Sequence, residues 1–137
     1  MATKEEIISF YENYLDEIEQ PDFSTSPFIY RGTYHFEDKE NLNLPALFID
    51  EGEADTYEYA GLGSNSMLVN YHLIIKGRIK GDWEDYNNFM DDVISRINDK
   101  DNNTYWAWTS LDRVEASFDP NSDLKEFNLY LTVKQIN

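Results

Sequence analysis

The sequence predicts a single α+β domain, in which a mostly antiparallel β-sheet packs against two helices in the order α-β-β-β-α-β-β. Two observations carry this prediction. Between residues 67 and 80, nearly every second residue is apolar, which is the pattern of a strand with one buried face. Between residues 82 and 98, apolar residues recur every three or four positions, as in an amphipathic helix. The whole chain, residues 1–137, has the length of one domain.

This strand and helix are expected to form the core by burying their apolar sides against each other. Asp82 is the expected N-cap of the helix because its carboxylate can accept a hydrogen bond from the first turn. The apolar side of the strand consists of Met67, Val69, Tyr71, Leu73, Ile75 and Ile79. The helical stripe consists of Trp83, Tyr86, Met90, Val93 and Ile97, widened by Phe89 and Ile94. We expect Trp83, Met90, Val93 and Ile97 to be buried against Val69, Leu73 and Ile75.

A first helix is predicted over Thr3–Gln20. Thr3 and Glu6 form a capping box at its start, and Pro21 ends it. Its outer face is acidic, which is typical of a solvated surface. The first residues contain no long apolar run, so no secretory signal is expected.

Two strands are predicted before the central strand, followed by a long loop. The first runs from Phe28 to Phe36, with Gly32 as a candidate bulge, and the second from Ala46 to Ile49. Residues 51–66, which contain three glycines among acidic residues, are expected to form a loop that is mobile or held by a partner.

The C-terminal part predicts an antiparallel hairpin. The segment from Tyr105 to Phe118 is apolar and β-prone, but its alternation slips around Ser110 to Arg113, which indicates either a bent strand or two short strands. A strong turn signal follows at residues 119–122, and the last strand, Leu124–Ile136, alternates cleanly.

Composition favours a folded acidic protein whose partners are proteins. The net charge is −16 and the pI about 4.2, which oppose binding to nucleic-acid phosphates and to anionic membranes. No stretch reaches the roughly 20 apolar residues of a membrane span. The chain lacks cysteine, which excludes disulfides and thiolate metal sites. Aromatic residues make up 15% of the chain and offer contact surface for a core or an interface.

The sequence carries no recognisable catalytic or cofactor-binding motif. The two histidines, His35 and His72, lie far apart in strand patterns and are interpreted as sheet or surface residues. Residues 61–66 lack the third glycine and the following helix of a dinucleotide-binding loop. Residues 99–110 begin like a calcium loop, but Thr104 and Ser110 stand where it needs glycine and glutamate. We therefore expect no enzyme activity, no cofactor and no metal site.

One charged feature has two interpretations. Lys76, Arg78 and Lys80 alternate along one face of the central strand. They either protect a strand edge from stray pairing or dock onto the acidic surface of a neighbouring copy. In the second case their partners are expected to be Glu53, Asp55 and Glu58, or acids of the first helix.

The element order resembles that of phage tail terminator proteins, also called tail-to-head joining or tail completion proteins. The matching segments are Thr3–Gln20, the run PALFIDEGE at Pro45–Glu53, Leu68–Gly77, Asp82–Ile97 and Leu124–Ile136. The resemblance implies a homo-oligomeric ring, hexameric in that family, which caps the tail tube and joins it to the neck. It further implies tail tube and neck or connector proteins as partners, and DNA passing through the lumen without specific binding. The protein would be made in the host cytoplasm and reside in the virion at the tail–neck junction.

Two other classes of function compete with this one. A small acidic adaptor or inhibitor would bind a basic protein, or mimic nucleic acid, through acids arrayed on one surface such as the first helix. An unrecognised hydrolase would use carboxylates and a metal.

Overall fold

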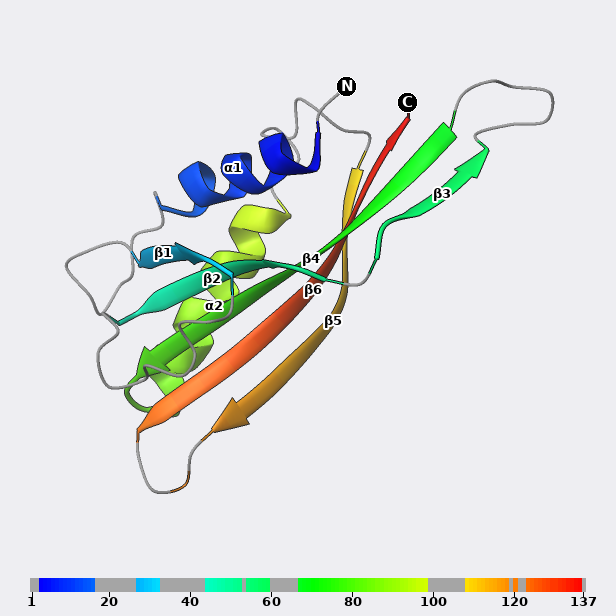
Figure 1. Ribbon diagram of the computed structural model, residues 1–137. Helices are drawn as coiled ribbons and strands as arrows, with labels where there is room; N and C mark the ends of the chain where they lie inside the picture. Colours follow the sequence, from blue (N-terminus) through cyan, green and yellow to red (C-terminus); the bar gives the residue numbers. More distant parts are fainter. Residues whose placement is uncertain are drawn as a thin grey trace.

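The computed structural model describes residues 3–16, 27–32, 44–52, 54–59, 67–98, 108–118, 120 and 123–136. In this part of the chain, a six-stranded sheet and two helices form the α+β fold that the sequence predicts (Figure 1). The helices are α1 (Lys4–Leu15) and α2 (Trp83–Ile97). The strands are β1 (Phe28–Arg31), β2 (Ala46–Glu51), β3 (Thr56–Tyr59), β4 (Met67–Lys80), β5 (Trp108–Phe118) and β6 (Leu124–Ile136).

The central strand is β4, as the sequence predicts. The strand order is β1-β2-β4-β6-β5, and β3 pairs with the start of β4 beyond the end of β2. Only β1 and β2 are parallel among these pairs. Strand β6 pairs with β4 from Leu68 opposite Ile136 to Lys80 opposite Leu124, so these two long strands form the centre of the sheet.

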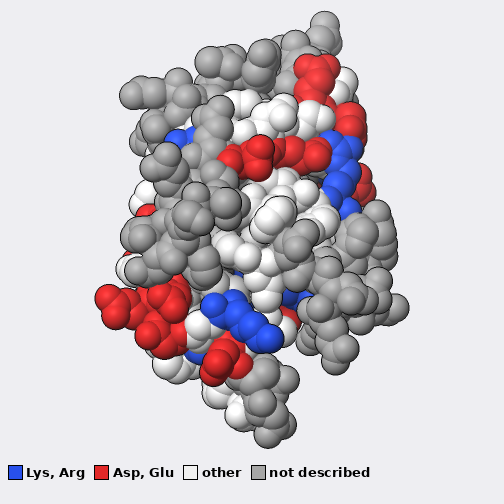
Figure 2. All heavy atoms as spheres, turned by 90° about the vertical axis from the view of Figure 1, so that its left-hand side faces the viewer, with Lys and Arg blue, Asp and Glu red and all other residues white. Residues whose placement is uncertain are grey.

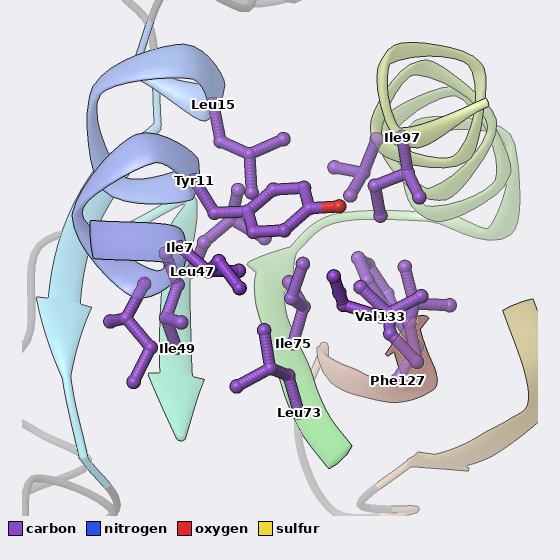
Figure 3. Close-up of a cluster of buried hydrophobic side chains, with 14 of the residues drawn as sticks. Ile7, Tyr11, Leu15, Leu47, Ile49, Leu73, Ile75, Ile97, Phe127 and Val133 are labelled. Carbon is purple, nitrogen blue, oxygen red and sulfur yellow. The ribbon is translucent and has the colours of Figure 1, made fainter. Parts of the chain in front are cut away.

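Both helices pack on the same face of the sheet, and the core lies between them and the strands (Figures 1 and 3). Figure 3 shows side chains of α1, β2, β4, α2 and β6 pointing toward one another. The alternation predicted for β4 is confirmed, because Val69, Leu73, Ile75 and Ile79 are all buried in this core. We call the opposite side the helix-free face, since neither α1 nor α2 packs there.

The helix starts are confirmed at both caps. The Thr3 hydroxyl accepts a hydrogen bond from the backbone N–H of Glu6 at 3.2 Å. The Asp82 carboxylate accepts from the N–H of Asp85 at 2.9 Å, and Asp85 accepts in return from the N–H of Asp82 at 3.3 Å. Residues 17–20, predicted to extend the first helix, lie outside the described residues.

The prediction for the face of α2 is wrong at its first residue. Trp83 is 50% exposed, whereas Tyr86, Phe89, Val93 and Ile97 are buried and Met90 is partly buried. The Trp83 ring contacts Tyr86 and Phe118 edge-on, and the Lys125 ammonium lies 5.1 Å from its centroid. The stripe that contacts the sheet therefore begins one turn into the helix.

One prediction for these segments needs correction, one is tested only in part, and one is confirmed. Residues 51–66 are not wholly a loop, because Thr56–Tyr59 forms β3, which pairs with the start of β4. The four residues of β3 include a threonine and two tyrosines, which suit a strand. Strand β1 ends at Arg31, and the predicted continuation through Phe36 lies outside the described residues. The slip predicted near Ser110 is a bulge in one bent strand, between Leu111 and Arg113.

The buried phenol of Tyr11 makes stability sensitive to alkali. Burial raises the pKa of Tyr11 to about 12, although the hydrogen bond to Thr109 opposes this rise. Above about pH 10 the unfolded chain therefore loses this proton before the folded chain does, and stability falls as the pH rises. The loss attributable to Tyr11 is expected to reach about 2–3 kcal/mol near pH 12.

Urea denaturation of the wild type and of Tyr11→Phe at rising pH tests this expectation. Burial also raises the pKa of Tyr71 and Tyr86, so both proteins should lose stability in alkali. Tyr11→Phe should lose less, because its ring cannot ionise. Parallel stability curves for the two proteins would mean that Tyr11 does not contribute.

Candidate functional site

The predicted basic strip of β4 is interrupted at its centre. Arg78 is only 1% exposed, and its Nε lies 3.2 Å from Glu126 Oε1 on the neighbouring β6. Its guanidinium lies 5.4 Å from the centroid of the Phe48 ring on β2. Burial lowers the pKa of Arg78, and the charge of Glu126 opposes that shift. Arg78 therefore lies on the predicted face of β4 but is buried there, and its described contacts lie within its own chain.

The two flanking lysines differ from each other. Lys76 Nζ lies 3.6 Å from the Asp50 carboxylate on β2, whereas Lys80 at the end of β4 is exposed. Figure 2 shows no continuous basic strip among the described residues on the face that it draws, where the larger groups of Lys and Arg atoms border Asp or Glu atoms. The edge-protection interpretation does not hold at Lys76 and Arg78, because β4 pairs with β2 and with β6 at both positions.

The predicted acidic partners are only partly described. Lys4 Nζ lies 2.8 Å from the Asp55 carboxylate, so Asp55 ties the start of α1 to the segment before β3. Glu53 lies outside the described residues. The backbone of Glu58 belongs to β3, and its side chain is outside the description. The six predicted interface residues are thus not brought together within one described chain.

A hollow of about 230 Å³ opens on the helix-free face of the sheet, where β4, β6 and β5 lie side by side. His72, Asp112, Arg113 and Tyr130 supply its polar lining, and Gly52, Ile74 and the backbone of neighbouring residues complete it. These residues come from four separate segments of the chain, so only the folded sheet assembles them.

A chain of hydrogen bonds fixes the histidine in this hollow. The Asp112 carboxylate accepts from the Ser110 hydroxyl at 2.9 Å and from the Thr132 hydroxyl. Thr132 Oγ1 also lies 3.2 Å from His72 Nδ1. Because the only hydroxyl proton of Thr132 goes to Asp112, its oxygen must accept from Nδ1. The neutral His72 ring therefore carries its proton on Nδ1 and offers the lone pair of Nε2.

The walls of the hollow are held in place by further contacts. The backbone N–H of Gly52 donates to the His72 carbonyl at 2.9 Å, and a Cβ at Gly52 would lie 3.1 Å from the His72 backbone. On the other side, the Arg113 guanidinium lies 4.0 Å from the centroid of the Tyr130 ring. Glu115 binds Arg113 Nε and the Tyr130 hydroxyl, each at 3.1 Å. The positive charge of Arg113 is thus balanced within its own chain.

The sequence predicted two features of this hollow, but it did not indicate that they lie next to each other. It placed His72 on the outer side of β4 and detected the slip that is now seen to be the bulge at Asp112. Nothing in the sequence showed that β6 lies between β4 and β5, which brings Thr132 between these two side chains.

Comparison with known proteins leaves the family open, because no family model and no curated protein matches this sequence. No three His, Asp or Glu side chains in the described part of the chain are grouped as a metal site would require. Among the described residues, no helix is long and apolar enough to cross a membrane.

Proposed function

We propose that this chain is a structural virion protein resembling a phage tail terminator, which forms a hexameric ring that caps the tail tube and joins it to the neck. The observation that carries the proposal is the order of elements. The run from Pro45 enters β2, and the long β4, the amphipathic α2 and the β5–β6 hairpin follow as the resemblance requires. Tail tube and neck or connector proteins are its partners in this proposal.

The charge of the chain is compatible with a ring around DNA. Carboxylates facing a lumen repel phosphates, so DNA could pass without being held. The same charge, −16 per copy, opposes assembly. Salt at physiological strength screens exposed charges beyond about 8 Å, so repulsion across the ring is weak, whereas close ion pairs at the contacts survive.

Exposed apolar side chains supply a contact surface for such an assembly. Trp83, Val114 and Phe118 are 50%, 41% and 58% exposed. The rings of Trp83 and Phe118 contact each other at a centroid distance of 5.5 Å. These two side chains therefore form one patch that joins the start of α2 to the end of the edge strand β5. Aromatic residues grouped in this way are typical of interfaces and can provide most of the affinity.

Analytical ultracentrifugation and negative-stain microscopy test the proposal. The purified chain should form rings alone or on the ends of tail tubes, and capped tubes should stop growing. Phe118→Ser should weaken assembly, whereas Asn128→Ser on the helix-free side of β6 serves as a comparable polar-surface control. A chain that stays monomeric and never binds tube ends would refute the ring.

The acidic adaptor remains the second candidate, because Glu5 on α1 is 68% exposed. However, Arg31 forms ion pairs with both Glu5 and Glu12, so part of the acidity of α1 is neutralised within the chain. A strict monomer that binds a basic protein with nanomolar affinity would favour this function over the ring.

A further inference from the structure

Lys80 differs from the other exposed cations that the structure describes. Arg31 pairs with Glu5 and Glu12, and Arg113 pairs with Glu115. Lys80 is exposed at the end of β4, and within the described residues no carboxylate lies within ion-pair distance of its ammonium. In a chain with a charge of −16, such a cation can form an ion pair with an acidic surface of another copy.

The hollow at His72 has the complementary chemistry. Its histidine offers an Nε2 lone pair, and each oxygen of Asp112 accepts one described hydroxyl bond, which leaves room for another. Arg113 does not oppose a cation strongly, because Glu115 balances its charge. The hollow is therefore a site for a hydrogen-bond donor that carries positive charge.

The size of the hollow argues for a side chain as its occupant. Pockets for drug-sized molecules have volumes of about 300–1,000 Å³. The hollow, at about 230 Å³, is smaller and opens on one face of the sheet. It has room for the end of one long side chain, such as the methylene groups and ammonium of lysine.

We propose that Lys80 of one copy inserts into the His72–Asp112 hollow of the next copy, where its ammonium donates to His72 Nε2 and to the Asp112 carboxylate. This inference rests on the proposed ring, and it assigns one contact between neighbouring copies of that ring. Lys80 is six residues along β4 from Ile74 of the hollow, about 20 Å away, so it cannot reach its own hollow. Two different surfaces meet in such a contact, and repetition of it generates a ring or an open filament.

Mixing two charge-reversed variants tests the contact. Lys80→Glu and Asp112→Lys should each raise the concentration needed for assembly about tenfold or more, while circular dichroism shows that both fold. An equimolar mixture should assemble like the wild type, because alternating copies restore an opposite-charge pair at every contact. The double variant Lys80→Glu/Asp91→Lys has the net charge of the wild type, because Asp91 on the exposed side of α2 supplies the compensating change, but its contact stays reversed and it should not recover.

A second measurement keeps Lys80 and Asp112 unchanged, so it does not depend on whether Asp112→Lys folds. Diethyl pyrocarbonate modifies accessible histidines, and the chain has only His72 and His35. Mass spectrometry of His35→Gln should show His72 modified in the monomer and protected in the ring.

The outcomes separate this contact from the proposed function. A wild-type ring with His72 unprotected, or without recovery in the mixture of folded variants, overturns the contact and leaves the ring intact. Assembly of the Lys80→Glu/Asp91→Lys double variant would also overturn it, since the effect would then be one of net charge alone. A wild type that never assembles overturns both.

Discussion

Replacing Val93 with aspartate is expected to lower the free energy of unfolding by about 3–5 kcal/mol, because it places an unpaired carboxylate in the core. Val93 is fully buried, in the part of α2 that faces the sheet, and belongs to the same cluster as Leu73 and Ile75. A domain of this kind has a total stability of about 5–15 kcal/mol, so a large fraction would be lost. Urea denaturation followed by circular dichroism measures the difference.

Asn87→Asp provides the matched control for Val93→Asp. Asn87 lies on the exposed side of the same helix, so the same new carboxylate remains in water. Its effect should stay within about 0.5 kcal/mol. If Val93→Asp unfolds at the same urea concentration as the parent, the face of α2 that we assign to the core is wrong.

Periodicity predicted the faces of the main elements correctly and failed at their ends. The alternation of β4 identified its core side because a strand has only two faces. The stripe of α2 identified Val93 and Ile97, but a stripe carries no information about where the sheet beneath it stops. Trp83 continues the pattern and yet is half exposed beside Phe118.

Arg78 illustrates a different limit of the sequence. The alternation placed it on the helix-free face, and its register opposite Glu126 and Ala46 agrees with that side. Its burial depends on Phe48 and Glu126, which come from other strands. Reversing Lys76, Arg78 and Lys80 together would therefore bury a carboxylate at position 78. Lys80 alone is the suitable position for testing assembly.

The hollow could not be predicted, because its hydrogen bonds join residues far apart in the chain. His72 and Thr132 are opposite each other in the β4–β6 register, and Asp112, which the bulge displaces from the β5 ladder, accepts a hydrogen bond from Thr132. The missed strand β3 has a similar explanation. Its four residues suit a strand, but the start of β4 decides whether they pair.

Gly77, the one glycine of β4, is expected to be hard to replace, because the ring of Phe127 occupies the space where a side chain would lie. The two residues are opposite each other in the β4–β6 register. A Cβ at Gly77 would lie 2.1–2.6 Å from three ring carbons of Phe127, far inside normal contact distance. The Phe127 ring is held by contacts with Phe89 and Tyr86, so it cannot swing aside without moving α2.

Gly77→Val therefore sets two effects of opposite sign against each other. Valine favours a strand over glycine by up to about 1 kcal/mol. Overpacking a filled core costs about 1–3 kcal/mol and occasionally more, and the close approach to Phe127 places this site at the upper end. The variant should consequently unfold at a lower urea concentration than the wild type. Adding Phe127→Leu to Gly77→Val should cost less than the sum of the single changes, because the smaller side chain removes the collision. Equal or higher stability of Gly77→Val would show that Phe127 moves freely and that strand preference decides the outcome.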